Sequence, residues 1–168
     1  MRNFRTGWFL LCAVPAGFAA AVASAAEVGA PAPALALPTA GGETVALDAL
    51  RGRVVYVDFW ASWCSPCRKS FPWMAEMQKK YGPSGFAVIA VNVDKRRADA
   101  DRFLQSTAAQ FTVVYDPVGT TPKAWNVKAM PSSFVIDTKG NVAIIESGFR
   151  DENVVELERR IRSLVDAK

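Results

Sequence analysis

Two kinds of hydrophobic pattern run along the chain, and each predicts one type of element. Runs of β-branched and aromatic residues predict buried strands at 54–60, 86–93, 111–115, 133–136 and 142–147. Apolar residues three or four positions apart predict helices at 65–81 and 96–105, a short helix at 122–125 and a last helix from about 151. Strands and helices therefore alternate, which predicts an α/β fold with a central mixed sheet flanked by helices on both faces.

Turn and end signals refine these elements. The segment from Asp137 to Asn141 predicts a tight antiparallel hairpin, with Gly140 at a position that needs positive φ. The Gly41-Gly42 pair predicts a turn inside an N-terminal hairpin that ends at 44–47. Pro72 should kink the helix at 65–81, and Asp151 should cap the last helix. That helix should bury one stripe, made of Val154, Leu157, Ile161 and Leu164.

The first 25 residues have the pattern of an export signal. Arg2 and Arg5 precede an apolar run at 7–22, and 23–25 is a small-residue sequence suited to signal peptidase. We expect cleavage there, which would leave residues 26–168 as one domain in the periplasm. The alternative is an uncleaved anchor that holds the protein in the membrane, facing the periplasm. Lipidation at Cys12 is disfavoured, because Leu11 stands where a small residue is expected.

Composition excludes several functions. The chain has 168 residues, a net charge of +4 and no dense block of Lys or Arg, so we expect no nucleic-acid partner. It has no histidine, which excludes Ser-His and Cys-His hydrolysis, Cys2His2 zinc and His-ligated haem within the chain. We therefore expect no cofactor and no metal. We also expect a protein that acts as a monomer.

The segment Trp63-Cys64-Ser65-Pro66-Cys67 carries the candidate chemistry. It lies between a predicted strand and a predicted helix, so Cys64 should be an exposed thiolate that the helix N-terminus favours, with Arg68 adding positive charge. Cys67, one turn on, could then attack a mixed disulfide formed at Cys64. The alternatives to a redox-active pair are an inert disulfide and half of a zinc site. Zinc needs further ligands, however, and the mature chain has no other cysteine.

A family resemblance rests on these residues. The stretch 56–67 (YVDFWASWCSPC) resembles the active-site stretch of thioredoxins, Pro72 matches the kinking proline of their active-site helix, and Met130-Pro131 resembles their cis-proline loop. The leader hairpin, the export signal and residues 91–94 are similar to the bacterial TlpA/ResA-type branch, which is periplasmic or membrane-tethered. The likeness covers nearly all of residues 30–165 and implies a thioredoxin-like fold with an N-terminal β-hairpin extension.

The resemblance also implies roles for single residues. Asp58 would lie buried beneath the cysteines and accept the proton of Cys67; otherwise it is a carboxylate that reaches solvent at the strand end. Pro131 would be cis beside the sulfurs and let the Met130 backbone pair with a client; otherwise it is an ordinary turn proline. The substrate surface would include Trp63, with Ser65 and Pro66 beside it. Trp60, Met74 and Met77 are expected to pack in the core.

The sequence thus predicts a thiol-disulfide oxidoreductase. By resemblance it would reduce disulfide-bearing exported proteins with electrons from a membrane thiol relay, in cytochrome c maturation or in general periplasmic redox homeostasis. Ser70 stands where many cytochrome-maturation relatives have a glutamate, which argues against an apocytochrome client. Two alternatives are a peroxiredoxin-like peroxidase, whose Pro-x-x-x-Thr-x-x-Cys setting is absent, and a copper carrier, which a histidine would have supported.

Overall fold

A five-stranded mixed sheet forms the centre of the protein. The computed structural model describes residues 25–107 and 109–167. The strand order is β5-β4-β3-β6-β7; β3 and β4 are parallel, as are β4 and β5, whereas β6 is antiparallel to β3 and β7 to β6. The strands are β3 (Val54–Trp60), β4 (Phe86–Asn92), β5 (Thr112–Tyr115), β6 (Ser132–Ile136) and β7 (Val142–Ser147). The predicted mixed sheet is confirmed.

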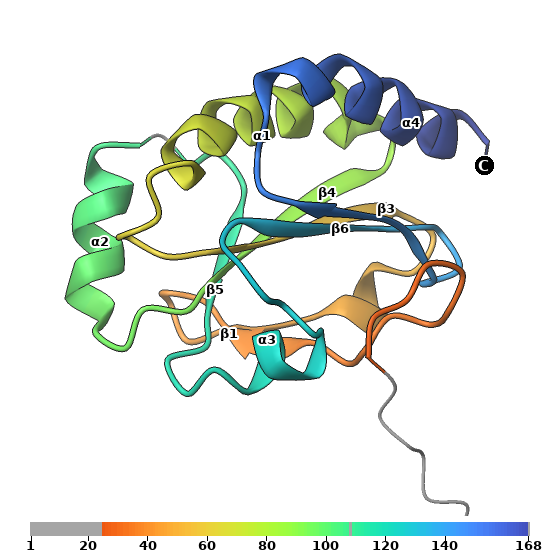
Figure 1. Ribbon diagram of the computed structural model, residues 1–168. Coiled ribbons are helices and arrows are strands. Elements are labelled where there is room, and N and C mark those ends of the chain that lie inside the picture. The colour runs from red at the N-terminus through yellow and green to blue at the C-terminus, as the bar shows by residue number, and fades with distance from the viewer. Residues whose placement is uncertain (1–24, 108, 168) are drawn as a thin grey trace, which may run out of the picture.

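Helices cover both faces of this sheet, as expected. Figure 1 shows α1 and α4 together on one face, α3 and the N-terminal hairpin on the other, and α2 at one side. The helices are α1 (Cys67–Tyr81), α2 (Arg97–Gln105), α3 (Thr120–Ala124) and α4 (Val154–Asp166), with 3-10 turns at Leu47–Leu50, Gly82–Ser84 and Asp151–Asn153. The hairpin pairs β1 (Ala36–Pro38) with β2 (Thr44–Ala46) in antiparallel register. It confirms the predicted N-terminal extension.

The sheet separates two apolar clusters. Every residue of β3 is buried, and alternate side chains enter opposite clusters, because successive residues of a strand point to opposite faces. On the α1 and α4 face, Phe71 packs with its ring centroid 4.9 Å from that of Trp60 and 5.0 Å from that of Phe103 in α2. On the other face, Phe59 and Phe134 pack against Trp125. Met74 and Met77 are buried in the first cluster.

The ends of the predicted elements were less accurate than their cores. Gly140 has φ 84°, as the turn sequence requires, and α1 runs through Pro72. The capping role of Asp151 was wrong: Asp151–Asn153 forms a 3-10 turn, α4 begins at Val154, and no side chain caps it. Leu157 and Ile161 are buried as predicted, while Val165, outside the predicted stripe, is buried too.

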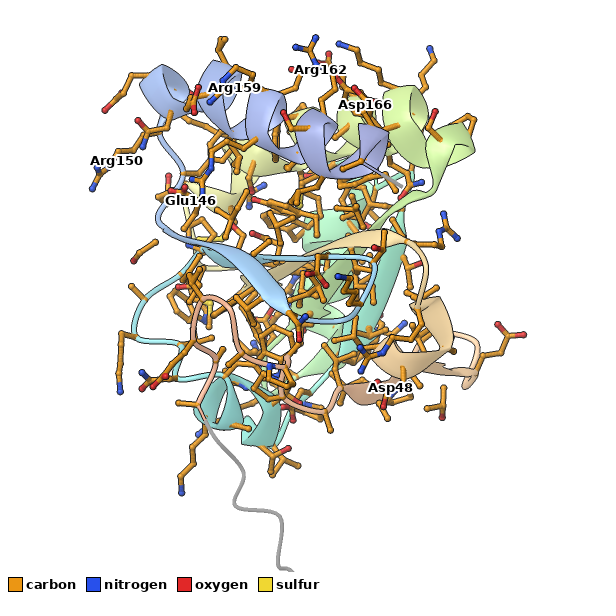
Figure 2. All side chains as sticks on the ribbon, turned by 90° about the vertical axis from the view of Figure 1, so that its right-hand side faces the viewer. Asp48, Glu146, Arg150, Arg159, Arg162 and Asp166 are labelled. Carbon is orange, nitrogen blue, oxygen red and sulfur yellow. A yellow bond between two sulfur atoms is a disulfide. The ribbon has the colours of Figure 1, made fainter. Side chains whose placement is uncertain are left out.

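Charged residues cover the outer side of α4. Figure 2 shows Arg159 and Arg162 on the side of α4 that faces away from the sheet.

Within residues 25–107 and 109–167, none of the helices has the length and apolar character needed to cross a bilayer. The predicted export signal lies outside the described residues apart from Ala25, so its cleavage stays a prediction.

The aromatic contacts of Phe71 lead to a stability prediction. Replacing Phe71 with Ala should lower the free energy of unfolding of the oxidised protein by about 3–5 kcal/mol, because the surrounding rings cannot fill the cavity. Urea unfolding measures this loss. Val155→Ala is the control, since Val155 is 79% exposed and its loss should change stability by less than about 0.5 kcal/mol. Equal effects of the two substitutions would contradict this account of the core.

Candidate functional site

Cys64 and Cys67 form a disulfide at the point where the central strand passes into α1. β3 ends at Trp60, residues 61–63 lead to Cys64, and α1 begins at Cys67. The two sulfurs are bonded, with the Cα atoms 5.4 Å apart. The Cys-x-x-Cys spacing thus brings the sulfurs together where α1 begins.

The start of α1 holds the first sulfur through a backbone group. The Cys67 N–H donates to Cys64 Sγ over 3.3 Å. The following N–H groups of Arg68 and Lys69 donate to the carbonyls of Ser65 and Pro66, which closes the first turn. Because a helix N-terminus carries partial positive charge, this geometry favours a negative charge on Cys64 when the disulfide opens.

The exposure of the site differs from the sequence expectation at Cys64. Trp63 is 71% exposed, and Ser65 and Pro66 are exposed beside it. Cys64 is only 3% exposed and Cys67 is fully buried, whereas we expected an exposed first sulfur. In the oxidised state the first sulfur faces its partner and the Cys67 N–H, so little of it contacts solvent. The accessible rim of the site is therefore formed by Trp63, Ser65 and Pro66.

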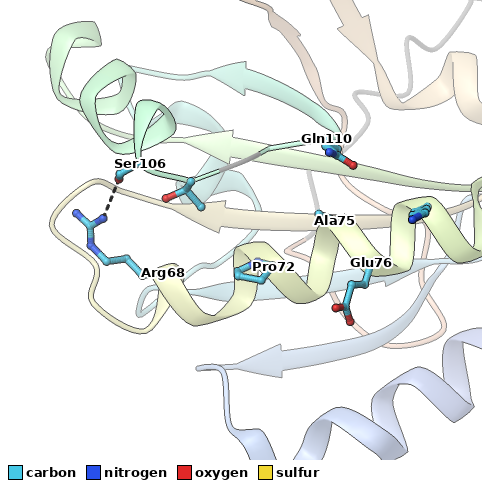
Figure 3. A pocket seen from close by; sticks show the side chains of 8 residues that line it. Arg68, Pro72, Ala75, Glu76, Ser106 and Gln110 are labelled. Carbon is cyan, nitrogen blue, oxygen red and sulfur yellow. Dashed lines mark hydrogen bonds between the residues drawn. The ribbon is translucent and has the colours of Figure 1, made fainter.

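The Arg68 side chain contacts α2. Its guanidinium lies over the Phe103 ring, 4.6 Å from the centroid, and donates to Ser106 Oγ over 3.3 Å. Figure 3 shows this contact at one end of a cavity of about 510 Å³, which Pro72 and Glu76 also line. The contacts of Arg68 thus tie α1 to α2, and the backbone, not this side chain, contacts the Cys64 sulfur.

A hydrogen-bond network anchors the segment before the cysteines, and it was not predicted from the sequence. Asp94 Oδ2 accepts the Ser62 N–H over 2.9 Å, and its Oδ1 accepts the Ser62 hydroxyl over 3.0 Å. The Asn92 amide donates to the same carboxylate over 2.8 Å. Asp94 and Asn92 are buried, so these bonds hold the segment that carries Trp63 and Cys64 against the end of β4.

Asp58 is completely buried in the middle of β3. It lies on the α1 face, since its alternate neighbours Tyr56 and Trp60 belong to the cluster that includes both cysteines. Neither carboxylate oxygen has a hydrogen-bond partner among the described groups. Burial raises the pKa of Asp58 well above the ordinary value, and the Ser133 hydroxyl lowers it by a smaller amount. The alternative of a carboxylate that reaches solvent is therefore wrong.

Two buried hydroxyl groups accompany Asp58, and sequence analysis missed both. Ser133 on β6 pairs with Asp58 across the sheet, and the Tyr56 hydroxyl donates to Ser133 Oγ over 2.7 Å. Burial raises the pKa of Tyr56, and the nearby Asp58 raises it further. Only the strand register, which pairs the two residues, could have revealed Ser133 from the sequence.

The Met130-Pro131 bond is cis, as the resemblance implied. Ser132, the next residue, pairs with Phe59 on β3, so Pro131 lies beside the strand end that leads to the cysteines. The Pro131 carbonyl accepts the Gly148 N–H, and Met130 packs half-buried against both apolar clusters. Across residues 25–107 and 109–167, no group of three or more His, Cys, Asp or Glu side chains is placed to hold a metal ion.

Comparison with known proteins agrees with this geometry. The Redoxin family model matches residues 27–161. The thiol-disulfide oxidoreductase ResA of Bacillus subtilis (strain 168) is 32% identical over 127 residues, which cover 76% of this chain and 71% of that protein. The ResA of Geobacillus kaustophilus (strain HTA426) is 31% identical over 141 residues, which cover 84% and 80%.

Solved structures show the same likeness in three dimensions. A Chlorobium tepidum protein assigned as a thiol:disulfide interchange protein, DsbE, superimposes with a TM-score of 0.81 at 48% identity, over 84% of this chain and 99% of that chain. The thioredoxin domain of a Bacteroides vulgatus thiol-disulfide oxidoreductase has a TM-score of 0.72 at 25% identity, over 80% and 98%. The chain belongs to the Redoxin family within the thioredoxin superfamily, and it is a thiol-disulfide oxidoreductase of the ResA/TlpA type.

Proposed function

We propose that this oxidoreductase works outside the cytoplasm, where it reduces disulfides in exported proteins. The observation that carries the proposal is the Cys67 N–H on the Cys64 sulfur at the start of α1. A sulfur in that position forms a thiolate readily, and the thiolate is the nucleophile that disulfide exchange requires.

The reaction proceeds in two exchanges. The Cys64 thiolate attacks one sulfur of a client disulfide, which forms a mixed disulfide and releases the other client sulfur as a thiolate. Cys67 then loses its proton and attacks Cys64, so that the second client sulfur leaves with the electron pair. The client gains two electrons and the protein ends in the disulfide state that the structure shows. A dithiol in a membrane thiol relay would return the two electrons.

Asp58 is the proton acceptor for the second exchange. Cys67 is fully buried, so its thiol needs an internal base before it can attack. Asp58 lies on the same face of the sheet, and its raised pKa makes the carboxylate a better proton acceptor than an ordinary aspartate.

The client would dock on the exposed rim of the site. Trp63 offers a large apolar surface beside the disulfide, with Ser65 and Pro66 next to it. The backbone of Met130, which precedes the cis-proline, would pair with an extended client segment. A monomer suffices for these steps, because every residue used comes from one chain.

Position 70 favours general disulfide reduction over cytochrome c maturation. Ser70 is buried, and its hydroxyl donates to the Cys67 carbonyl over 3.1 Å, so this position supplies no carboxylate near the cysteines. We therefore propose disulfide-bearing exported proteins in general as clients. The membrane thiol relay as electron donor and the periplasm as location rest on the family and on the sequence of residues 1–25.

The reducing direction can be tested by the reduction potential. Equilibration in glutathione and dithiothreitol buffers, read by alkylation of the free thiols, should give a value closer to the −270 mV or so of thioredoxin than to the −120 mV or so of DsbA. A value near that of DsbA would contradict the proposal. In parallel, Cys67→Ala should trap exported clients on Cys64 as mixed disulfides, while the matched Cys64→Ala variant should trap none.

Asp58→Asn tests the buried base. The variant should reduce insulin more slowly by a factor of about 10²–10⁴, the usual contribution of a positioned base. The raised pKa also predicts a pH-dependent stability. The native state holds the Asp58 proton more tightly than the unfolded chain, so this stabilisation is complete below the unfolded pKa of about 3.9 and is lost as the pH rises through the higher native pKa.

The Asn side chain is neutral at every pH, so Asp58→Asn should become more stable than the wild type as the pH rises above about 4. Urea unfolding of both oxidised proteins between pH 4 and pH 8 measures the difference, and the comparison cancels the other carboxyl groups. A stability difference that stays constant over this range would show that the native carboxyl is ionised throughout.

Trp63→Ala tests the docking surface. The variant should lose about tenfold in kcat/KM for a protein client, because a central tryptophan commonly contributes more than about 1 kcal/mol to binding. Its rate with a small disulfide such as oxidised glutathione should stay within about twofold of the wild type, since the cysteines are unchanged. Val155→Ala, on α4, is the control for loss of an exposed apolar side chain. A parallel loss with both substrates would contradict a docking role.

A further inference from the structure

A row of polar side chains crosses the sheet from the buried acid towards the surface. Asp58 on β3 pairs with Ser133 on β6, and Ser133 pairs with Glu146 on β7. Paired residues point to the same face of a sheet with their Cβ atoms about 5 Å apart, so the row leads away from the cysteines in two short steps. Asp58 is fully buried, Ser133 is 4% exposed and Glu146 is half-buried.

The hydroxyl groups in this row are oriented for transfer. The Tyr56 hydroxyl donates its hydrogen to Ser133 Oγ, so the single hydrogen of Ser133 is free to point elsewhere. The carboxylate of Asp58 lies opposite and lacks a partner in the oxidised structure. Ser133 is close enough to lower the pKa of that carboxyl, although the geometry of a full hydrogen bond is not reached.

A small cavity continues the row beyond Ser133. It has a volume of about 10 Å³ and is lined by Tyr56, Ser133 and Glu146, with Arg150 beside them. This is about the space of one water molecule, and the polar lining supplies the partners that such a water needs. Figure 2 shows Glu146 and Arg150 at the same end of the molecule.

We propose that Ser133, held in position by Tyr56, passes a proton between Asp58 and Glu146, and so reloads the buried base in each catalytic cycle. This inference rests on the proposed role of Asp58 as the acceptor of the Cys67 proton. The base needs such a route because it is fully buried and its oxygens have no hydrogen-bond partner among the described residues.

The transfer conserves protons and moves no electrons. When Cys67 attacks the mixed disulfide, its thiol proton passes to the Asp58 carboxylate. Asp58 then gives that proton to Ser133 Oγ, and Ser133 gives its own hydroxyl proton to a water bound in the cavity, which has room for one. The water passes one of its protons to the Glu146 carboxylate, which releases it to solvent. The Tyr56 hydroxyl, which donates to Ser133, holds the serine in position and is a positioning residue.

Two arginines lie at the exit of the row, beside Glu146 or its cavity. Arg160 of α4 lies with Nη1 3.7 Å from Glu146 Oε1, and Arg150 lines the same cavity. The titratable groups that face the row are thus Asp58 and Tyr56 from β3 and Glu146 from β7. Burial raises the pKa of Asp58, so its carboxylate can take up the Cys67 proton.

Ser133→Ala separates the route from the base. Insulin reduction should slow by about tenfold, which is less than the loss of about 10²–10⁴ expected for the base itself, because Asp58 is still present. The solvent deuterium isotope effect should rise above that of the wild type, because proton transfer becomes rate-limiting. The reduction potential should stay unchanged, since both end states keep the same sulfurs. Ser133→Thr retains a hydroxyl and should restore most of the rate, and Glu146→Gln should slow turnover in the same way as Ser133→Ala.

Tyr81→Phe is the matched control, because the Tyr81 hydroxyl bonds Glu158 on α4, away from this row. If Asp58→Asn reduces insulin slowly but Ser133→Ala reduces it within twofold of the wild-type rate, the route is overturned and Asp58 remains the base. An unchanged rate for Asp58→Asn would overturn both assignments. Slow Ser133→Ala with a shifted potential and an unchanged isotope effect would show a structural role and contradict the inference.

Discussion

The hydrogen bond from the Cys67 N–H to the Cys64 sulfur depends on where α1 begins, and most of the structure serves to fix that point. Aromatic packing of Phe71 against Trp60 and Phe103 holds α1 on the sheet, while Asp94 holds the preceding segment through Ser62. A shift of α1 by one residue would remove the N–H from the sulfur. The packing that fixes the start of α1 therefore also determines the reactivity of the Cys64 sulfur.

The surroundings of this site favour the charged form of one ionisable group and the neutral form of another. The helix N-terminus favours the charged form of Cys64, whereas burial without a partner favours the neutral form of Asp58. Environments that push pKa values apart in this way allow one group to act as nucleophile and another to exchange protons at the same pH. A buried base must also exchange its proton with solvent, and the proposed row through Ser133 provides the route for that exchange.

Much of this arrangement could be predicted from the sequence. The continuous apolar runs identify β3 and β4, the helical spacing identifies α1, and the family resemblance predicts the cis bond before Pro131 and the burial of Asp58. These features have local or strongly patterned signals.

Features that depend on cross-strand register or on side-chain direction could not be predicted. Ser133 is an ordinary serine until the sheet pairs it with Asp58, and Arg68 has several partners within reach of its long side chain. The low exposure of Cys64 depends on its tertiary surroundings. Asp151 has the residue type of a helix N-cap, but α4 begins at Val154 without a side-chain capping hydrogen bond.

The acidity of Cys64 tests the central claim most directly. The reduced protein is alkylated with iodoacetamide over a range of pH, and the rate at Cys64 is followed by mass spectrometry. If the helix start stabilises the thiolate, the rate should reach half its maximum well below pH 8.5, the value for a free cysteine, and within the range of about 3.5–7.5 found for such sites. A midpoint at or above about 8.5 would contradict the account.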